Sequence, residues 1–281
     1  MDSRRIYGCM PTFKSLPEKG NVLVELIEEF VERVAKPLHK ELIMLYEGKR
    51  IRPKQYSFNR DNWEKARKMF LEGRITHFHL CCFEKEIWQS DSDINPMSID
   101  MRIDSGYEYP GSAGSIEFSV AKWLYGEKTP EYLQYAFVEM LEELYKSLQG
   151  VSGFVTLDGI SAGYSLSPHE IHMGILGGYT SVSMQFHRYY RGYFWGNFLN
   201  PVHVKLLGGL ERVADEAPVY KTKKLADGGM FLQLTNDIDN VTDEDLRRLK
   251  CYLRSILPPK QTEQDPRSYY KLRVIEDECT D

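Results

Sequence analysis

Apolar side chains recur at three- and four-residue spacing in several stretches of the chain, a pattern typical of helices that bury one face. This periodicity predicts helices over 21–38, 60–72, 129–150 and 242–257. Their ends carry matching signals. Asn59 or Asp61 and Thr242 can cap a first turn, and Pro130 can occupy a first helical position without losing a hydrogen bond.

Alternating or strongly branched and aromatic segments predict β-strands elsewhere. The expected strands are 75–83, 98–104, 115–121, 153–157, 219–221 and 230–234. The first two are expected to pair as a loose hairpin across the turn at 91–96. Residues 42–45 are interpreted as a continuation of the first helix, and residues 1–20 as irregular because Pro11 and Pro17 interrupt any regular pattern.

The order of these elements bears on the fold class. Helices and strands alternate irregularly, with short linkers and no repeat, which favours one α+β domain with helices against a mainly antiparallel sheet. The expected organisation is an N-terminal helical extension over 1–74, the α+β domain over 75–257 and a polar C-terminal tail over 258–281.

Residues that start, end or interrupt secondary structure are densest in the stretch 191–210. Asn200 and Pro201 predict the start of a short helix, and Gly208 or Gly209 its left-handed end. These residues are expected to be architectural, with the indole as an anchor and the amides satisfying the backbone of turns. The architectural set is Trp195, Asn197, Asn200, Pro201, His203, Gly208 and Gly209. The aromatic run 189–195 fits either a buried core or an exposed dimer patch, so a homo-oligomer is possible but not indicated.

Composition and charge narrow the range of partners. The chain has 281 residues, 36 basic against 41 acidic, and a net charge of −5, which disfavours nucleic acid or an anionic membrane as a partner. The N-terminus lacks an apolar signal region and no apolar run is long enough to span a membrane, so a cytoplasmic location is expected. The five cysteines are scattered, which argues against a disulfide framework or a structural zinc site.

One hydrolase-like motif is present. The segment Gly159-Ile-Ser161-Ala-Gly163 matches the G-x-S-x-G nucleophile elbow and follows an expected strand. A hydrolase of that class needs an acid and then a histidine after the serine, yet Glu170 is the only acid between Ser161 and the last histidine, His203. A glycine-rich loop is therefore favoured over a catalytic serine.

Pairs of histidines and of acidic residues are weaker indications of a metal site or of paired catalytic carboxylates. His77 and His79 lie at i and i+2 of an expected strand and share a face, where Asp100 and Asp104 of the neighbouring strand could converge with them on a metal. His169 and His172 form a second pair, and Glu84 and Glu86 a pair of carboxylates on one strand face. Without further ligands at suitable spacing, ordinary surface side chains are the favoured interpretation, and no metal or cofactor is expected.

The central stretch also carries a family resemblance. The run WGNFLNPVH from Trp195 to His203, the following LLGGL at 206–210, the strand DGGMFLQL at 227–234 and the helix 242–257 resemble the bacterial type VI immunity family, related to the immunity proteins of polymorphic toxin systems. The segment 153–168 fits the same pattern. The resemblance covers about residues 75–257 and implies a cytosolic protein that protects a bacterium by binding a cognate toxin, without a generally assigned active site.

The resemblance and the failed catalytic motifs together favour a non-enzymatic immunity protein that inhibits a toxin by occlusion. An acidic inhibitor suits a basic toxin cleft, because complementary charge speeds association. The candidate contact residues form two acidic groups, Glu25, Glu28, Glu29 and Glu32 in one and Asp237, Asp239, Asp243, Glu244 and Asp245 in the other. Two alternatives stay open: an enzyme, hydrolytic or metal-dependent, that reverses toxin damage, and an adaptor whose partner is not a toxin.

Overall fold

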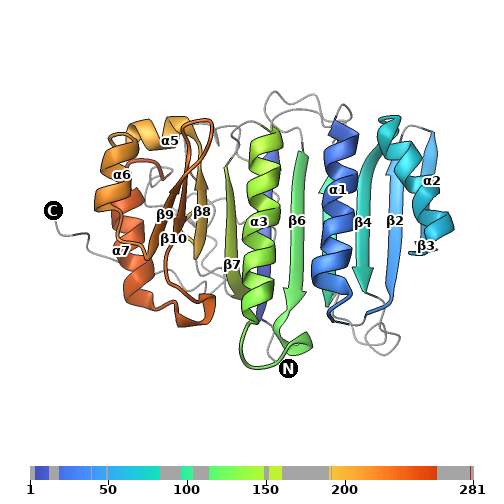
Figure 1. Cartoon of the computed structure of the whole chain (residues 1–281), viewed down its shortest axis with the longest axis horizontal. Helices are drawn as coiled ribbons and strands as arrows, with labels where there is room; N and C mark the ends of the chain where they lie inside the picture. Colours follow the sequence, from blue (N-terminus) through green and yellow to red (C-terminus); the bar gives the residue numbers. More distant parts are fainter. Residues whose placement is uncertain are drawn as a thin grey trace, which may run out of the picture.

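A computed structural model describes residues 4–12, 19–38, 40–48, 50–82, 96–103, 114–148, 152–159, 190, 192–257 and 279 of the chain. Ten strands form a single sheet in the order β3-β2-β4-β5-β6-β1-β7-β8-β10-β9. Every pair of neighbouring strands is antiparallel. The predicted α+β fold with a mainly antiparallel sheet is confirmed (Figure 1).

The strands are short to moderate in length. Their bounds are β1 Arg4–Thr12, β2 Leu42–Gly48, β3 Ile51–Ser57, β4 Ile75–Cys82, β5 Met97–Arg102, β6 Gly114–Ala121, β7 Gly153–Gly159, β8 Gly196–Leu199, β9 Lys221–Lys224 and β10 Met230–Gln233. The two edge strands, β3 and β9, contain lysine, and β3 also contains Pro53. Both residue types discourage pairing with the strand of another chain.

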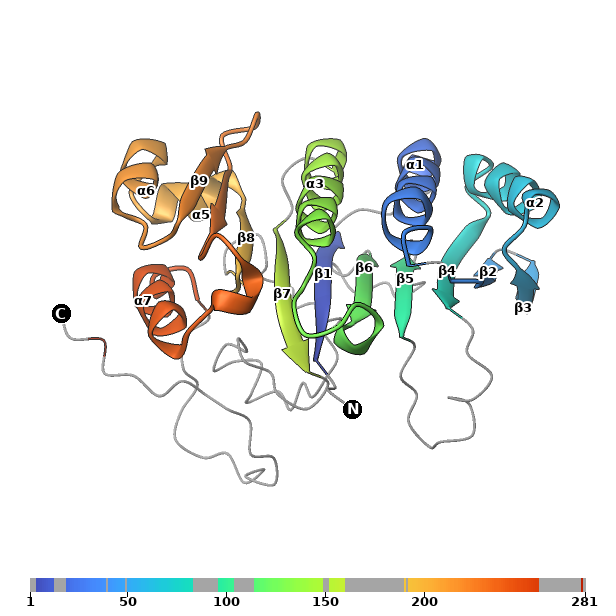
Figure 2. The same cartoon turned by 60° about the horizontal axis from the view of Figure 1, so that its bottom comes forward.

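The helices pack on this sheet. Their bounds are α1 Gly20–Phe30, α2 Arg60–Leu71, α3 Glu131–Leu148, α5 Pro201–Leu206, α6 Leu210–Glu216 and α7 Asp243–Leu253, with a π-helical turn at Val31–Ala35 and 3₁₀ turns η4 at Lys122–Leu124 and η5 at Ile238–Asn240. Figure 2 shows α1, α2 and α3 side by side on one face of the sheet, and Figure 1 shows α5, α6 and α7 gathered at the β8–β10–β9 end. None of the helices in the described ranges is both long and apolar enough to cross a membrane.

Several predicted helix ends are present. The side chains of Asn59, Asn200 and Thr242 each accept a hydrogen bond from a backbone N–H of the first turn, and Thr242 forms a capping box with Asp245. Gly208 and Gly209 both have φ of +101°, a conformation that glycine adopts without steric penalty. Aromatic contacts then bind helix to sheet, as between Phe137 of α3 and Phe118 of β6, whose ring centroids are 4.9 Å apart.

The N-terminal segment departs from its prediction. Residues 1–74 do contain α1 and α2, but they are not a separate helical extension, because β1 lies between β6 and β7 in the middle of the sheet. The prediction that residues 1–20 are irregular is wrong for residues 4–12, which form β1. Pro11 lies next to the last residue of β1, beyond Cys9 where the register with β7 ends, and proline is tolerated near strand ends better than in the middle of a sheet.

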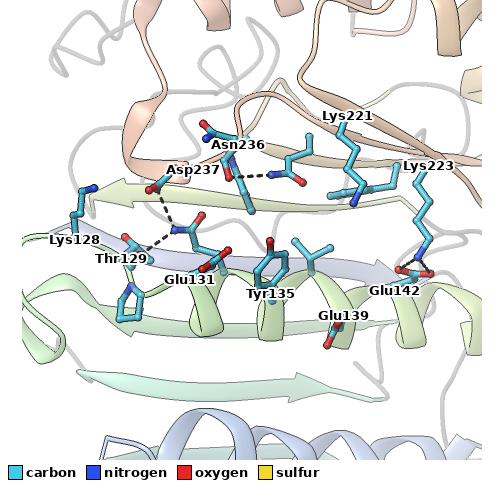
Figure 3. A pocket seen from close by; sticks show the side chains of 16 residues that line it. Lys128, Thr129, Glu131, Tyr135, Glu139, Glu142, Lys221, Lys223, Asn236 and Asp237 are labelled. Atoms are coloured by element: carbon cyan, nitrogen blue, oxygen red, sulfur yellow. Dashed lines mark hydrogen bonds and ion pairs between the residues drawn. The ribbon is translucent and has the colours of Figure 1, made fainter.

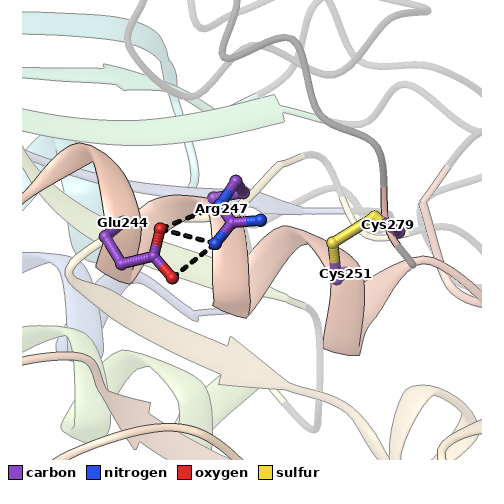
Figure 4. Close-up of a disulfide and its surroundings, with 4 residues drawn as sticks. All are labelled: Glu244, Arg247, Cys251 and Cys279. Carbon is purple, nitrogen blue, oxygen red and sulfur yellow. Dashed lines mark hydrogen bonds and ion pairs between the residues drawn. A yellow bond between two sulfur atoms is a disulfide. The ribbon is translucent and has the colours of Figure 1, made fainter. Parts of the chain in front are cut away.

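Two further predictions need correction. Residues 42–45 belong to strand β2 and not to a helix. Leu42, Met44 and Tyr46 are buried, while Ile43 and Leu45 between them are half-buried, which is the alternation of a strand. The chain also contains one disulfide, between Cys251 of α7 and Cys279, whose Cα atoms lie 5.6 Å apart (Figure 4). The bond joins residues 28 positions apart, a separation without a recognisable spacing motif.

Candidate functional site

A groove lies between α3 and the β9–β10 hairpin, with a volume of about 480 Å³ (Figure 3). We call it the α3–β9 groove. Its lining residues are Lys128, Thr129, Pro130, Glu131, Gln134, Tyr135, Val138, Glu139, Glu142, Trp195, Lys221, Lys223, Phe231, Gln233, Asn236 and Asp237. A concave site of this size is within the range in which proteins bind small molecules or anchor side chains of a partner.

Two elements supply the walls and two buried rings supply apolar lining. Helix α3 contributes Glu131, Tyr135 and Glu142 to one wall. The opposite face of this helix, which carries Leu133, Phe137 and Met140, is buried. Across the groove, the Nζ of Lys223 on β9 lies 2.7 Å from both carboxylate oxygens of Glu142. The rings of Trp195 and Phe231 line the groove and are buried.

One end of the groove is fixed by the amide of Gln134. Its Nε2 donates to the backbone oxygen of Thr129 at 2.9 Å and to Asp237 Oδ1 at 3.1 Å, and its Oε1 accepts from the backbone N–H of Ile238 at 3.0 Å. The Gln134 side chain is buried, so each of these bonds forms away from bulk water. The first turn of α3 is thereby joined to η5 in a defined geometry.

A buried ion pair supports the same end. Lys122 Nζ lies 2.7 Å from Asp239 Oδ1, and the backbone N–H of Thr129 donates to Asp239 Oδ2 at 2.5 Å. Burial favours the protonated form of Asp239, but the hydrogen bonds from Lys122 and Thr129 outweigh it and lower the pKa of this carboxyl. Asp237 and Asp239 were predicted as candidate contact residues, and the structure gives both of them internal hydrogen-bond partners.

Other members of the two predicted acidic groups also have local partners. Asp245 closes the capping box of α7, and Glu244 pairs with Arg247 of the same helix (Figure 4). On α1, Glu28 accepts from the indole of Trp63 at 3.0 Å, and Glu29 pairs with Arg33 of the π-helical turn that follows. Glu32 of that turn pairs with Lys36. Glu25 is exposed. The role of these acidic groups in contacting a partner stays a prediction.

The predicted architectural residues occupy tight positions. Asn197 is fully buried, where its Oδ1 accepts from the N–H of Phe194 at 3.0 Å and its Nδ2 donates to the oxygen of the same residue at 2.8 Å. The Trp195 indole N–H donates to the Thr235 oxygen at 2.9 Å. His203 is buried with its ring 5.6 Å from that of Tyr190. The described aromatics of the 189–195 run, Tyr190 and 193–195, are core residues and not an exposed patch.

A histidine–aspartate cluster lies on strands β4 and β5. The Nε2 of His77 and the Nδ1 of His79 each lie 3.0 Å from Asp100 Oδ2, so the predicted convergence of these three side chains is present. The bond to Asp100 raises the pKa of His77 despite burial, and the two imidazoles hold the pKa of Asp100 well below its usual range although burial opposes this. Within the described ranges, no three or more His, Cys, Asp or Glu side chains are placed to hold a metal ion.

Other predicted candidates cannot be placed. Ser161, the pair His169 and His172, the pair Glu84 and Glu86, and Asp104 lie outside the described residues. One juxtaposition on the described sheet was missed: Glu117 of β6 is the register partner of Asp100 and accepts from the Tyr7 hydroxyl at 2.5 Å. Only the strand pairing reveals it, because the two acids are 17 positions apart.

The α3–β9 groove was missed as well, because its lining comes from segments that lie up to about a hundred positions apart in sequence. A local signal existed on α3. Tyr132 and Tyr135 fall outside the apolar stripe of the predicted helix 129–150, and large aromatic side chains on the polar face of a helix are candidates for contact with a partner.

Comparison with known proteins adds one finding. No family model matches the sequence, and no curated protein matches it. A solved structure does share the fold. It is the T6SS (type VI secretion system) protein PA0821 of Pseudomonas aeruginosa. The TM-score is 0.59 at 14% sequence identity, and the match covers 90% of this chain and 73% of that chain. At this identity the likeness shows the fold alone, and membership of the type VI immunity family stays a prediction.

Proposed function

We propose that this protein is an immunity protein of a type VI secretion system, which binds a cognate toxin and neutralises it by occlusion. The observation that carries the proposal is the fold shared with a T6SS protein over 90% of the chain. The shared fold links the protein only to a type VI secretion system. The more specific assignment to an immunity protein rests on the resemblance of residues 75–257 to the type VI immunity family. Neither finding names the toxin or its activity.

A binding role agrees with the character of the α3–β9 groove. Its lining includes the exposed side chain of Tyr135, and tyrosine is enriched among the residues that dominate binding energy at protein interfaces. Occlusion needs a surface that already has its bound shape, and the Gln134 hydrogen bonds and the Lys122–Asp239 pair hold one end of the groove in place.

The enzymatic alternative has its own supporting observation in the sheet-face cluster. A carboxylate between two imidazoles, with Glu117 on the next strand, is a set of groups able to move protons. Such an enzyme would reverse toxin damage without forming a lasting complex. The two proposals therefore differ in a measurable way.

The test is co-expression of the tagged protein with the product of the adjacent open reading frame in a sensitive bacterium. Occlusion predicts rescue of growth together with a stoichiometric complex on size-exclusion chromatography, and Asp100→Asn and Ser161→Ala variants that still rescue. Rescue without a complex, abolished by Asp100→Asn or Ser161→Ala in a folded protein, would support the enzyme instead. Neither rescue nor complex would contradict both.

The predicted acidic surfaces are tested in the same system. The double variant Glu25→Lys/Glu32→Lys alters the acidic group of α1 and the following π-helical turn at exposed positions, without removing a core contact. If this group steers association, the variant should bind the toxin more slowly, and the difference from wild type should shrink as salt is added. Equal association rates at low salt would remove the electrostatic role of α1.

A further inference from the structure

Two of the carboxylates that line the α3–β9 groove lack a cationic partner. Glu131 and Asp237 both belong to the lining, and within the described residues no lysine or arginine pairs with either of them. The other two carboxylates of the lining, Glu139 and Glu142, each pair with a basic side chain. The negative charge that the protein itself leaves uncompensated in the groove is therefore that of Glu131 and Asp237.

Both carboxylates lie beside the buried amide of Gln134. Asp237 Oδ1 accepts from Gln134 Nε2 at 3.1 Å and from the backbone N–H of Asp239 at 3.0 Å, which fixes the position of this carboxylate. Glu131 precedes Gln134 by three positions on α3, so the two side chains are neighbours on the surface of the helix. Figure 3 shows Glu131 and Asp237 at the same end of the groove, which we call the acidic end.

The lysines of the groove do not neutralise its acidic end. Lys223 is held by Glu142, and Figure 3 shows Lys221 beside it, away from Asp237. Lys128 does adjoin the acidic end, but its side chain is exposed, and a long lysine chain can turn its ammonium group into solvent, whereas Asp237 is held in place. Four carboxylates against three lysines leave the lining net negative, as is the whole chain at −5.

An exposed aromatic ring stands next to this charge. Tyr135 lines the groove, is 54% exposed and follows Glu131 by four positions on α3, so its hydroxyl group reaches that carboxylate and donates a hydrogen bond to it. The face of such a ring attracts a cation, and most strongly the planar guanidinium of arginine. Fixed carboxylates and an aromatic face at one end of a groove therefore favour the same kind of occupant.

We propose that the acidic end of the α3–β9 groove receives an arginine side chain of the toxin. The guanidinium donates to the carboxylates of Glu131 and Asp237 together, and it stacks on the ring of Tyr135. Arginine is also among the residue types that dominate binding energy at protein interfaces. This assignment rests on the proposed immunity function, and it agrees with the relation expected from the overall composition, an acidic inhibitor on a basic toxin cleft.

The test measures the affinity of the complex and the rescue of growth, with the product of the adjacent open reading frame as the probe. Glu131→Gln/Asp237→Asn removes both charges and keeps an oxygen that can accept from Gln134. The matched control is Glu211→Gln/Glu244→Gln, which removes the same number of charges at exposed positions outside the groove lining. Glu131→Lys is a second variant that leaves Asp237 and its hydrogen bonds untouched. Thermal unfolding shows whether each variant is folded.

The groove variant should weaken the complex about 100-fold and lose rescue, because each of two charged hydrogen bonds contributes roughly a factor of ten to affinity. The control should stay within about threefold of wild type and still rescue. Glu131→Lys should bind at least about 10-fold more weakly than wild type, since it places an ammonium group beside the guanidinium.

Three outcomes would overturn the assignment. Equal affinities of the groove variant and the control, or tighter binding by Glu131→Lys, would do so while leaving the immunity function intact. Rescue by wild type without any complex would overturn it in favour of an enzyme. If wild type neither binds nor rescues, the immunity function fails and this assignment fails with it.

Discussion

Replacement of Asp239 by asparagine tests whether the buried ion pair stabilises the groove. The side chains of Lys122 and Asp239 are 6% and 11% exposed, and their charged atoms are 2.7 Å apart. Asparagine keeps the shape of the side chain and an oxygen for the N–H of Thr129, but it removes the negative charge. The Lys122 ammonium group would then remain buried without a counter-ion.

The size of the effect follows from the cost of an uncompensated buried charge. Removing one partner of a buried pair typically destabilises a protein by about 3–5 kcal/mol, whereas an exposed pair contributes about 0–1 kcal/mol. At roughly 2–3 °C per kcal/mol for a chain of this size, Asp239→Asn should lower the Tm by about 6–15 °C. The exposed pair of Glu244 and Arg247 is the matched control, and Glu244→Gln should change the free energy of unfolding by less than about 1 kcal/mol.

The pH dependence gives the prediction a second signature. Because the folded state lowers the pKa of Asp239, its stabilising effect is fully present above the unfolded pKa of about 3.9 and is lost as pH falls through the folded-state value. The difference in stability between wild type and Asp239→Asn should therefore be full at neutral pH and shrink in acid.

Urea unfolding followed by circular dichroism at neutral and acid pH measures both effects. A double variant, Lys122→Met/Asp239→Asn, should be less destabilised than the sum of its single variants, because it no longer buries a lone charge. The reasoning would be refuted by an Asp239→Asn variant within about 0.5 kcal/mol of wild type at neutral pH, or by additivity in the double variant.

Three further predictions concern other parts of the molecule. Asp100→Asn should destabilise by about 1–2 kcal/mol, because the Asp100 bonds to His77 and His79 are charge-assisted but partly exposed. Because the folded state raises the pKa of His77, the interaction adds stability below the unfolded pKa of about 6.5, and this stability is lost as pH rises through the folded-state pKa. The difference in Tm between wild type and Asp100→Asn should therefore be larger at pH 5–6 than at pH 8–9. An equal difference at both pH values would contradict the assignment. Trp195→Ala should lower the free energy of unfolding, measured in urea, by about 3–5 kcal/mol. Trp195→Phe loses mainly the hydrogen bond to the Thr235 oxygen and should lower it by about 1–2 kcal/mol. Equal losses in the two variants would show that the hydrogen bond, and not the packing of the ring, dominates. Unfolding without reductant should expose three alkylatable thiols by mass spectrometry and unfolding with reductant all five, whereas five in both conditions would exclude the disulfide between Cys251 and Cys279.

Local signals explain which elements were predictable from the sequence. Caps such as Asn59, Asn200 and Thr242 act within three residues, so they are recognisable in a short window. The alternation in β5 was equally clear, because one face of that strand is buried and the other is only half-buried. Strand β1 gave no such signal: Tyr7 and Cys9 are buried as well as Ile6 and Met10, so polar residues do not alternate with apolar ones.

Long-range contacts explain what the sequence could not reveal. Asp239 was predicted as a surface acid in the polar segment before α7, yet its partner Lys122 is 117 positions away. The α3–β9 groove likewise depends on how α3 sits beside β9 and β10, which no periodicity encodes. The His77–Asp100–His79 cluster was accessible because its strands are neighbours in both sequence and sheet.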